Sequence, residues 1–170
     1  GVFDKHFLLK YCSGFSHKTE KASPGFYSVN LQADNIDVEL TVSELAAMHR
    51  YHFNKKSDSQ NIVLNLGFTH SDHTTDAQIR YRSPELITGY RFSSGKANVH
   101  RVYFAMQFSR NMKEHRSFLA DTTAGDLVKG KQLAAAFSFD GTESQDLMVK
   151  VSISSVSEDG ALANLKTAKP

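Results

Sequence analysis

The stretch Ile36-Asp37-Val38-Glu39-Leu40-Thr41-Val42 carries the clearest structural signal in the chain, because apolar and polar side chains alternate along it without a break. Successive side chains of a β-strand point to opposite faces, so this alternation predicts a strand with one dry and one solvated face. Similar patterns occur at residues 102–108 and 147–153. Half-buried strands of this kind are typical of antiparallel sheets.

Shorter strand-like segments lie between turn-prone clusters such as 33–35, 93–95 and 140–141. They are 26–31, 49–53, 62–66, 77–82, 86–92 and 132–139. About nine strands at this spacing predict an all-β fold, an antiparallel β-sandwich rather than an alternating βαβ arrangement. Ser157, two acidic residues and several good helix formers follow, and they predict a short C-terminal helix from about Glu158.

Length and charge exclude several classes of protein. The 170 residues suit one domain, and 20 basic against 18 acidic residues give a net charge of +2. That charge is too small and too dispersed for a nucleic-acid-binding protein. No run approaches the roughly 18 apolar residues that cross a bilayer, so no membrane insertion is expected. The lone Cys12 excludes an internal disulfide and a multi-cysteine zinc site.

The least ordinary part of the chain is the segment 15–27, which contains His17, Glu20 and the pair Pro24-Gly25. Pro24-Gly25 suits a type II turn, in which glycine takes the positive φ of the third position. His17 and Glu20 precede that turn in an expected loop, where polar groups can be presented to a partner. Two interpretations stay open: a pair that faces a sugar or a neighbouring domain, or a structural hydrogen bond within the loop.

Other candidate sites have simpler explanations. His70, Asp72, His73 and Asp76 could ligate a metal, but residues so close together in a loop seldom converge on one ion, and a solvated turn is favoured. The sequence contains no G-x-S-x-G nucleophile elbow and no glycine-rich phosphate loop. We therefore predict no catalytic residue and no metal ligand in this chain.

Two carboxylates and several aromatic residues are of the types that act on or bind carbohydrates. Asp37 and Glu39 could do acid–base work on a glycoside, but solvated strand positions or salt-bridge partners are the favoured interpretation. A second set could stack on sugars or could simply be favoured in strands. It comprises Tyr81, Tyr90, Phe92 and Tyr103. A third set is interpreted as a mixed-charge turn and comprises Arg110, Lys113, Glu114, His115 and Arg116.

Several motifs, spread in order over nearly the whole chain, match one protein family. They are Phe15-Ser16-His17-x-x-Glu20-x-Ala22-x-Pro24-Gly25-Phe26-Tyr27, Ile36-x-x-Glu39-Leu40-Thr41, His49-Arg50-Tyr51-x-Phe53, Gly89-Tyr90-Arg91, Val102-Tyr103-Phe104 and Val149-Lys150-Val151-x-Ile153-Ser154. With these motifs the chain resembles the N-terminal domain of glycoside hydrolase family 92, the bacterial α-mannosidases. It departs from the family at Lys96, where a tryptophan often stands, and the family's glycine-rich segment and further strands before the Phe-Ser-His loop have no counterpart in it.

The resemblance implies a fold and a function. It implies a supersandwich of the galactose-mutarotase-like kind, so residues 1–170 would be one β-sandwich domain, a fragment of a larger exported glycosidase. It also implies hydrolysis of α-mannosides with inversion by a separate helical-barrel domain, which would hold the two carboxyl groups and a calcium ion. The chain alone would be inactive and without a cofactor. Its location would be periplasmic or extracellular, and its partners would be the barrel and mannose-containing glycans.

Under this interpretation His17 and Glu20 are the residues expected to line the substrate pocket or the domain interface. Two alternatives remain. A stand-alone carbohydrate-binding module would present an aromatic groove built from Tyr81, Tyr90 or Tyr103. A purely structural wedge would only orient the barrel and would place no atom near bound sugar.

Overall fold

The computed structural model describes residues 13–69, 71–95, 99–142 and 144–168, and these contain thirteen strands and one helix. The strands are β1 (Lys21–Ser23), β2 (Phe26–Leu31), β3 (Ile36–Val42), β4 (Ala46–Phe53), β5 (Ser59–Asn65), β6 (His73–Ser83), β7 (Leu86–Ser94), β8 (His100–Phe108), β9 (Glu114–Phe118), β10 (Thr122–Ala124), β11 (Leu127–Lys129), β12 (Ala134–Asp140) and β13 (Asp146–Ser154). The helix, α2, spans Glu158–Thr167. No helix within these ranges is long and apolar enough to cross a membrane.

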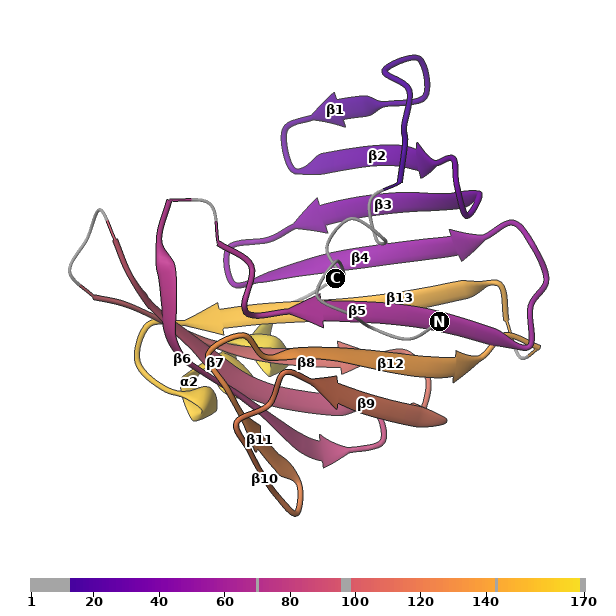
Figure 1. Cartoon of the computed structure of the whole chain (residues 1–170). Helices are drawn as coiled ribbons and strands as arrows, with labels where there is room; N and C mark the ends of the chain where they lie inside the picture. The colour runs from indigo at the N-terminus through magenta and orange to yellow at the C-terminus, as the bar shows by residue number, and fades with distance from the viewer. Residues whose placement is uncertain (1–12, 70, 96–98, 143, 169–170) are drawn as a thin grey trace.

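The strands form two antiparallel sheets, which confirms the predicted all-β sandwich (Figure 1). The large sheet has the order β1-β2-β3-β4-β13-β8-β7-β6-β11-β10, and the small sheet has the order β5-β12-β9. The small sheet lies across the middle of the large one in Figure 1. We call the face of the large sheet that meets the small sheet its inner face, and the opposite face its outer face.

The main core lies between the two sheets. Phe137 and Phe139 of β12 are fully buried, and their rings lie 5.2 and 5.0 Å from the ring of Phe108 in β8. Ile79 of β6 and Leu147 of β13 belong to the same cluster. These strands are therefore held together by apolar burial, the main stabilising contribution in a sandwich.

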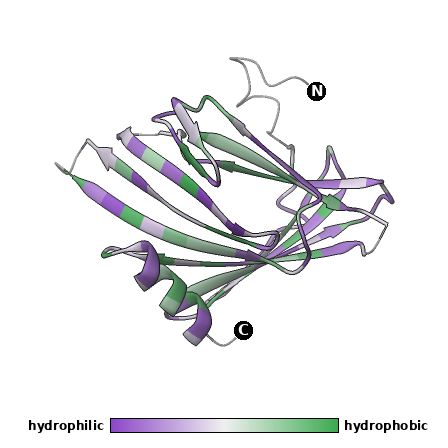
Figure 2. Cartoon of the chain, turned by 90° about the horizontal axis from the view of Figure 1, so that it is seen from below, coloured by the Kyte–Doolittle hydropathy of each residue, from purple (hydrophilic) through white to green (hydrophobic). Residues whose placement is uncertain are grey.

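The helix α2 packs against the outer face of the large sheet, beside β13, β8 and β7. Ala161 and Leu165 pack against Ala105 of β8. The cap is Ser157, whose Oγ accepts a hydrogen bond of 3.0 Å from the Gly160 amide, so the predicted helix start is confirmed. Figure 2 shows α2 lying along one side of the sheet, whose strands carry hydrophilic and hydrophobic residues in turn.

Several sequence-based expectations need correction. The residues 114–116, expected in a mixed-charge turn, lie in β9, which pairs with β12. Among the described strands β12 is the single neighbour of β9, and edge strands commonly carry charges, so the charged residues fit that place. The short strands β1, β10 and β11 were not expected. Several strands begin earlier than predicted, among them β4 at Ala46, β5 at Ser59 and β6 at His73. The strand β12 begins later than predicted, at Ala134.

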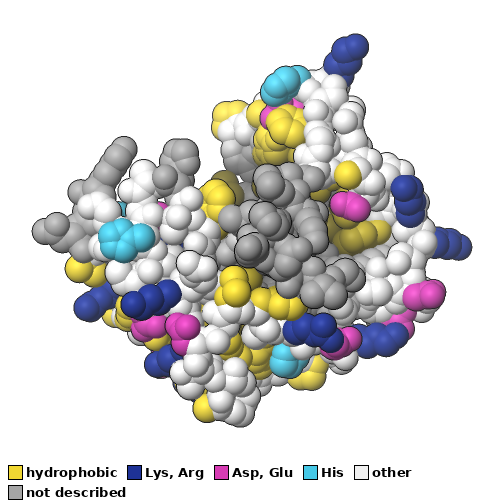
Figure 3. All heavy atoms as spheres, viewed as in Figure 1, with side chains coloured by type: hydrophobic (Ala, Val, Ile, Leu, Met, Phe, Trp, Pro, Cys, Tyr) yellow, Lys and Arg dark blue, Asp and Glu magenta, His cyan; other side chains and the backbone are white. Residues whose placement is uncertain are grey.

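The charged side chains do not gather by sign on the face seen in Figure 3, where basic and acidic groups lie scattered among each other. This agrees with the small net charge of the sequence. Cys12, His70 and Lys96 lie outside the described residues.

Candidate functional site

The structure brings His17 and Glu20 together at the edge of the large sheet. His17 Nδ1 lies 2.5 Å from Glu20 Oε2, and the hydroxyl of Tyr27 donates a 2.7 Å hydrogen bond to Glu20 Oε1. The Phe15 ring meets the His17 ring edge-on at 5.4 Å. The hydrogen bonds from His17 and Tyr27 lower the pKa of Glu20, so this carboxylate stays ionised and accepts from both sides.

The two members of this pair differ in exposure. The His17 side chain is 87% exposed, whereas that of Glu20 is 27% exposed. Gly25 has φ 76°, as the expected type II turn requires, and the turn joins β1 to β2. The pair is thus anchored through Glu20 and Tyr27 and presents the imidazole to solvent, which is compatible with both interpretations of the loop.

A second polar arrangement lies close by, on the outer face of β1–β4 and β13. The strand register places its side chains in two rows that run across the strands. The first row is Lys21, Ser28, Glu39 and Arg50, and the second is Asn30, Asp37, His52 and Asp146. Each of these residues alternates with an inward-facing neighbour, so the strand period itself puts them on one surface.

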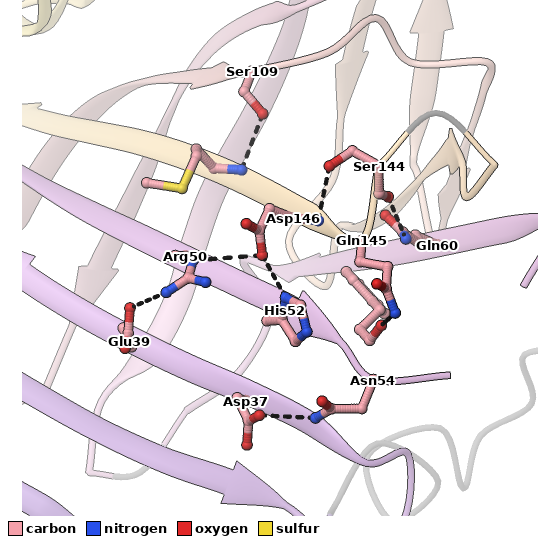
Figure 4. A network of polar contacts seen from close by, with 12 residues as sticks. Asp37, Glu39, Arg50, His52, Asn54, Gln60, Ser109, Ser144, Gln145 and Asp146 are labelled. Carbon is pink, nitrogen blue, oxygen red and sulfur yellow. Dashed lines mark hydrogen bonds and ion pairs between the residues drawn. The ribbon is translucent and has the colours of Figure 1, made fainter. Parts of the chain in front are cut away.

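The side chains of the second row form two hydrogen-bonded groups, one around Asp37 and one around Asp146, and Figure 4 shows the bonds from Asn54 and His52. Asp37 accepts from the side-chain amides of Asn30 at 2.7 Å and Asn54 at 2.8 Å. The Asn54 bond, followed by the Asn30 bond, lowers the pKa of Asp37. His52 Nδ1 lies 2.6 Å from Asp146 Oδ1, and this bond lowers the pKa of Asp146. An ionised carboxylate only accepts, so Nδ1 of His52 carries the proton.

Arg50 links the two rows (Figure 4). Its Nη1 donates to Glu39 Oε2 at 2.8 Å, and its Nε lies 3.4 Å from Asp146 Oδ1. The Glu39 bond is the main cause of the raised pKa of Arg50. Asp37 and Glu39 therefore serve as partners in a surface network, the interpretation that the sequence favoured over acid–base catalysis.

All residues of the two rows except Asp146 line an open hollow of about 420 Å³, which we call the β2–β4 hollow. It is lined by Thr19, Lys21, Ser28, Val29, Asn30, Asp37, Val38, Glu39, Arg50 and His52. Thr19 and Lys21 flank Glu20 in the sequence, so the His17–Glu20 loop and the hollow share one edge of the sheet.

A second hollow, of about 570 Å³, lies at the other end of the outer face, and we call it the β6–β8 hollow. Tyr90 and Phe92 stack at 4.2 Å, and Tyr103 meets both edge-on. Tyr90 is only 9% exposed, and burial followed by its bond to Asp76 raises its pKa. The aromatic rings thus pack mainly against one another.

Tyr81 does not join this aromatic group. It lies on the inner face, where its ring stacks on His115 at 3.8 Å and its hydroxyl lies 3.0 Å from Ser117 Oγ. Of the three tyrosines weighed for an aromatic groove, Tyr90 and Tyr103 therefore share the β6–β8 hollow, whereas Tyr81 lies on the opposite face of the sheet.

The described members of the set that was weighed as metal ligands, Asp72, His73 and Asp76, each contact a different partner. Asp72 pairs with Arg91 at 2.9 Å, Asp76 accepts from Tyr90, and His73 lies 2.7 Å from Ser94 Oγ. Within the described ranges no group of three or more His, Cys, Asp or Glu residues could hold a metal ion.

Sequence reasoning missed Arg50, His52 and Asp146 as parts of one network. Arg50 and His52 are two positions apart in β4, so the alternation of the strand could have placed both side chains on its solvated face. Asp146 lies 94 positions from His52 and meets it only through the pairing of β4 with β13.

Comparisons with known proteins point to one family. A family model, the glycosyl hydrolase family 92 N-terminal domain, matches residues 4–154. A family 92 α-mannosidase from Bacteroides thetaiotaomicron is 30% identical, with a TM-score of 0.82, over 91% of this chain and 22% of that enzyme. The same enzyme bound to mannoimidazole matches with an equal score. A search of curated proteins finds no match.

A more distant structure supports the fold. It is an inverting family 92 mannosidase from the same organism, 24% identical with a TM-score of 0.74, over 93% of this chain and 21% of that enzyme. The chain thus spans about a fifth of the length of these solved enzymes.

Proposed function

The chain belongs to the N-terminal domain family of glycosyl hydrolase family 92, and from this premise we propose that it is the accessory domain of an exported α-mannosidase. The main support is the 30% identity to an α-mannosidase over 91% of the chain. Inversion is proposed because one structural relative is an inverting mannosidase. The same premise supports a periplasmic or extracellular location and mannose-containing glycans as substrates.

Bond cleavage is assigned to a further domain of the same polypeptide, proposed to be a helical barrel that also holds calcium. An inverting glycosidase needs an acid and a base whose carboxyl groups are about 6.5–9.5 Å apart, with room for a water between them. The carboxylates of the β2–β4 network are engaged with amide, imidazole or guanidinium groups, and those of Asp37 and Asp146 have lowered pKa values. A carboxylate of lowered pKa is a poor general acid.

The proposal that cleavage belongs to a further domain is tested with the purified 170-residue chain and a synthetic α-mannoside. We expect no release of mannose from the chain alone and turnover from the full-length enzyme. Release of mannose by the chain alone would show that this proposal is wrong.

For His17 and Glu20 we propose a place at the domain interface or at the rim of the substrate pocket. The support is an exposed imidazole held by an anchored carboxylate in the loop that resembles the family most closely. In the full-length enzyme His17→Ala and Glu20→Ala should lower kcat/KM about ten-fold or more, because misplaced pocket groups are costly in the transition state. The thermal midpoint should change little, since surface ion pairs contribute little to stability.

The matched control is Lys18→Ala, which changes an exposed side chain of the same turn. It should leave both the kinetics and the thermal midpoint unchanged. Wild-type kinetics in both test variants would remove the pair from the pocket and leave the structural hydrogen bond as its role.

A further inference from the structure

We infer that the β2–β4 hollow is a non-catalytic binding site for a neutral carbohydrate, recognised by hydrogen bonds rather than by aromatic stacking. The identification of mannose-containing glycans as the natural ligand rests on the proposed function. The chemical class of the ligand follows from the lining side chains alone.

Charge balance argues for a neutral ligand. The lining contains two carboxylates, Asp37 and Glu39, and two cations, Lys21 and Arg50. An anionic ligand would meet the carboxylates, and a cationic ligand would meet Lys21 and Arg50. Val29 and Val38 are the apolar residues among the ten in the lining, so an apolar ligand would leave many polar groups without water or partner.

The side chains offer what a polyol needs. Each sugar hydroxyl can donate one hydrogen bond and accept others, so it is best met by donors and acceptors side by side. The cross-strand rows supply this alternation, with Lys21 and Arg50 donating and Glu39 and Asp37 accepting. Neighbouring strands are roughly 4.8 Å apart, so the row crosses the sheet in regular steps.

Hydrogen-bonding capacity is left over in the network. Among the lining residues, contacts with other described residues use one oxygen of Glu39 and two of the three nitrogens of Arg50. Because Nδ1 of His52 contacts Asp146, its Nε2 is left to face a ligand, as an acceptor in the neutral imidazole and as a donor in the protonated one. Arg50 and Glu39 are each 40% exposed and His52 is 31% exposed, so a ligand can reach them.

The groups are also held in place before a ligand arrives. Asp37 is fixed by the amides of Asn30 and Asn54, on strands that are themselves paired. Arg50 is fixed by two carboxylates (Figure 4). Binding therefore costs little side-chain entropy, which favours a ligand that makes several modest contacts. Because the lining contains no Phe, Tyr or Trp ring on which a sugar face could stack, the affinity should be weak, with Kd on the order of 1 mM.

The test is a titration of the ¹⁵N-labelled chain with mannobiose and, separately, with maltose, followed by amide chemical shifts. We expect mannobiose to shift amides of β2, β3 and β4. Shifts centred on Tyr90, Phe92 and Tyr103 would instead place sugar in the β6–β8 hollow and overturn the inference, as would the absence of shifts with both sugars.

Two arginines provide a matched comparison. Arg50 and Arg82 both lie on the outer face and both pair with a glutamate, Glu39 and Glu158 respectively, but only Arg50 lines the β2–β4 hollow. Arg50→Met should weaken mannobiose binding about ten-fold, and Arg82→Met should leave it within about two-fold. Equal effects of the two variants would contradict the site.

Folding of each variant is checked by thermal unfolding. Should Arg50→Met fail to fold, Lys21→Met replaces an exposed side chain of the same hollow and keeps the test decisive. Binding of maltose but not mannobiose would support the carbohydrate site while counting against the proposed mannoside substrate. If neither sugar bound, the inferred site would be wrong, and the proposed function would still be decided by the turnover assay described above.

Discussion

The centre of the large sheet, β6–β8 with β13, and its wing, β1–β3, are built from similar alternating strands but are stabilised differently. The centre packs against the small sheet on its inner face, and its outer face carries α2. Among the described residues the main core cluster includes members from β6, β7, β8 and β13 and none from β1, β2 or β3. Apolar packing specifies the centre, whereas ladder bonds and a polar network support the outer face of the wing.

This difference explains where a ligand-binding surface can form. Where a helix covers the outer face, the side chains in contact must be apolar and some must be small. Ala105 of the sheet and Ala161 of α2 are such side chains. Among the described residues α2 packs on β13, β8 and β7 and not on β2 or β3, so charged and amide side chains can line up across the wing at the β2–β4 hollow. The wing is therefore the region of the sheet that can change its surface chemistry at least cost to folding.

The largest effect is expected from truncating a core side chain of the centre. Phe137→Ala removes a fully buried ring and should lower the free energy of unfolding by about 3–5 kcal/mol. Val38→Ala, at a buried wing position that is 7% exposed, should cost about 1–2 kcal/mol, at about 0.8 kcal/mol for each buried methylene lost. Chemical denaturation measures both, and equal costs would remove the distinction between centre and wing.

A smaller effect is expected from the helix that covers the centre. Ser157→Ala removes the side-chain acceptor of the Gly160 amide and should cost about 1 kcal/mol. The control Ser155→Ala changes an exposed serine outside the helix and should have no measurable effect. Amide exchange should rise in α2 and stay unchanged in β2 and β3. Faster exchange in the wing would mean that the two regions unfold together.

The sequence was informative where burial is one-sided. The alternation at 36–42, 102–108 and 147–153 corresponds to β3, β8 and β13, and the capping Ser157 located the helix start. The same rule could have placed Tyr81 correctly, because it shares the phase of the buried Ile79. That phase turns the Tyr81 ring towards the core and away from the outer face that carries Tyr90 and Tyr103.

The sequence was uninformative where neighbours decide the structure. β9 and the three-residue strands β1 and β10 are largely exposed, so no dry face produces a period of two. The outer-face network depends on register, since pairing of β4 with β3 and β13 is what brings Arg50 between Glu39 and Asp146. No local pattern encodes such a meeting, whereas the His17–Glu20 bond, three positions apart, could be foreseen.

The smallest expected effect is on the acid stability of the protein, and it concerns two aspartates. Asp72 directly precedes β6 of the centre, and Asp37 lies in β3 of the wing. The hydrogen bond from the Arg91 guanidinium is the largest cause of the lowered pKa of Asp72, which is about 2. For Asp37 the largest causes of the lowered pKa are the hydrogen bonds from the neutral amides of Asn54 and Asn30. A carboxyl whose pKa is depressed by folding stabilises the native state above its unfolded value, 3.8, and loses that contribution as the pH falls towards the folded value. Asp72→Asn and Asp37→Asn should therefore each reduce the loss of thermal stability between about pH 4 and pH 2.

Salt should separate these two aspartates, because it screens the charge–charge contact of Asp72 more than the amide bonds of Asp37. At about 1 M salt, where the Debye length is about 3 Å, the difference between wild type and Asp72→Asn should shrink, and that for Asp37→Asn should persist. Thermal midpoints of the three proteins at two salt concentrations across this pH range provide the measurement. If salt reduced both differences equally, Asp37 would be held mainly by the nearby charges of His52 and Arg50, and the polar rows of the wing would be an ionic network like the clamp on Asp72.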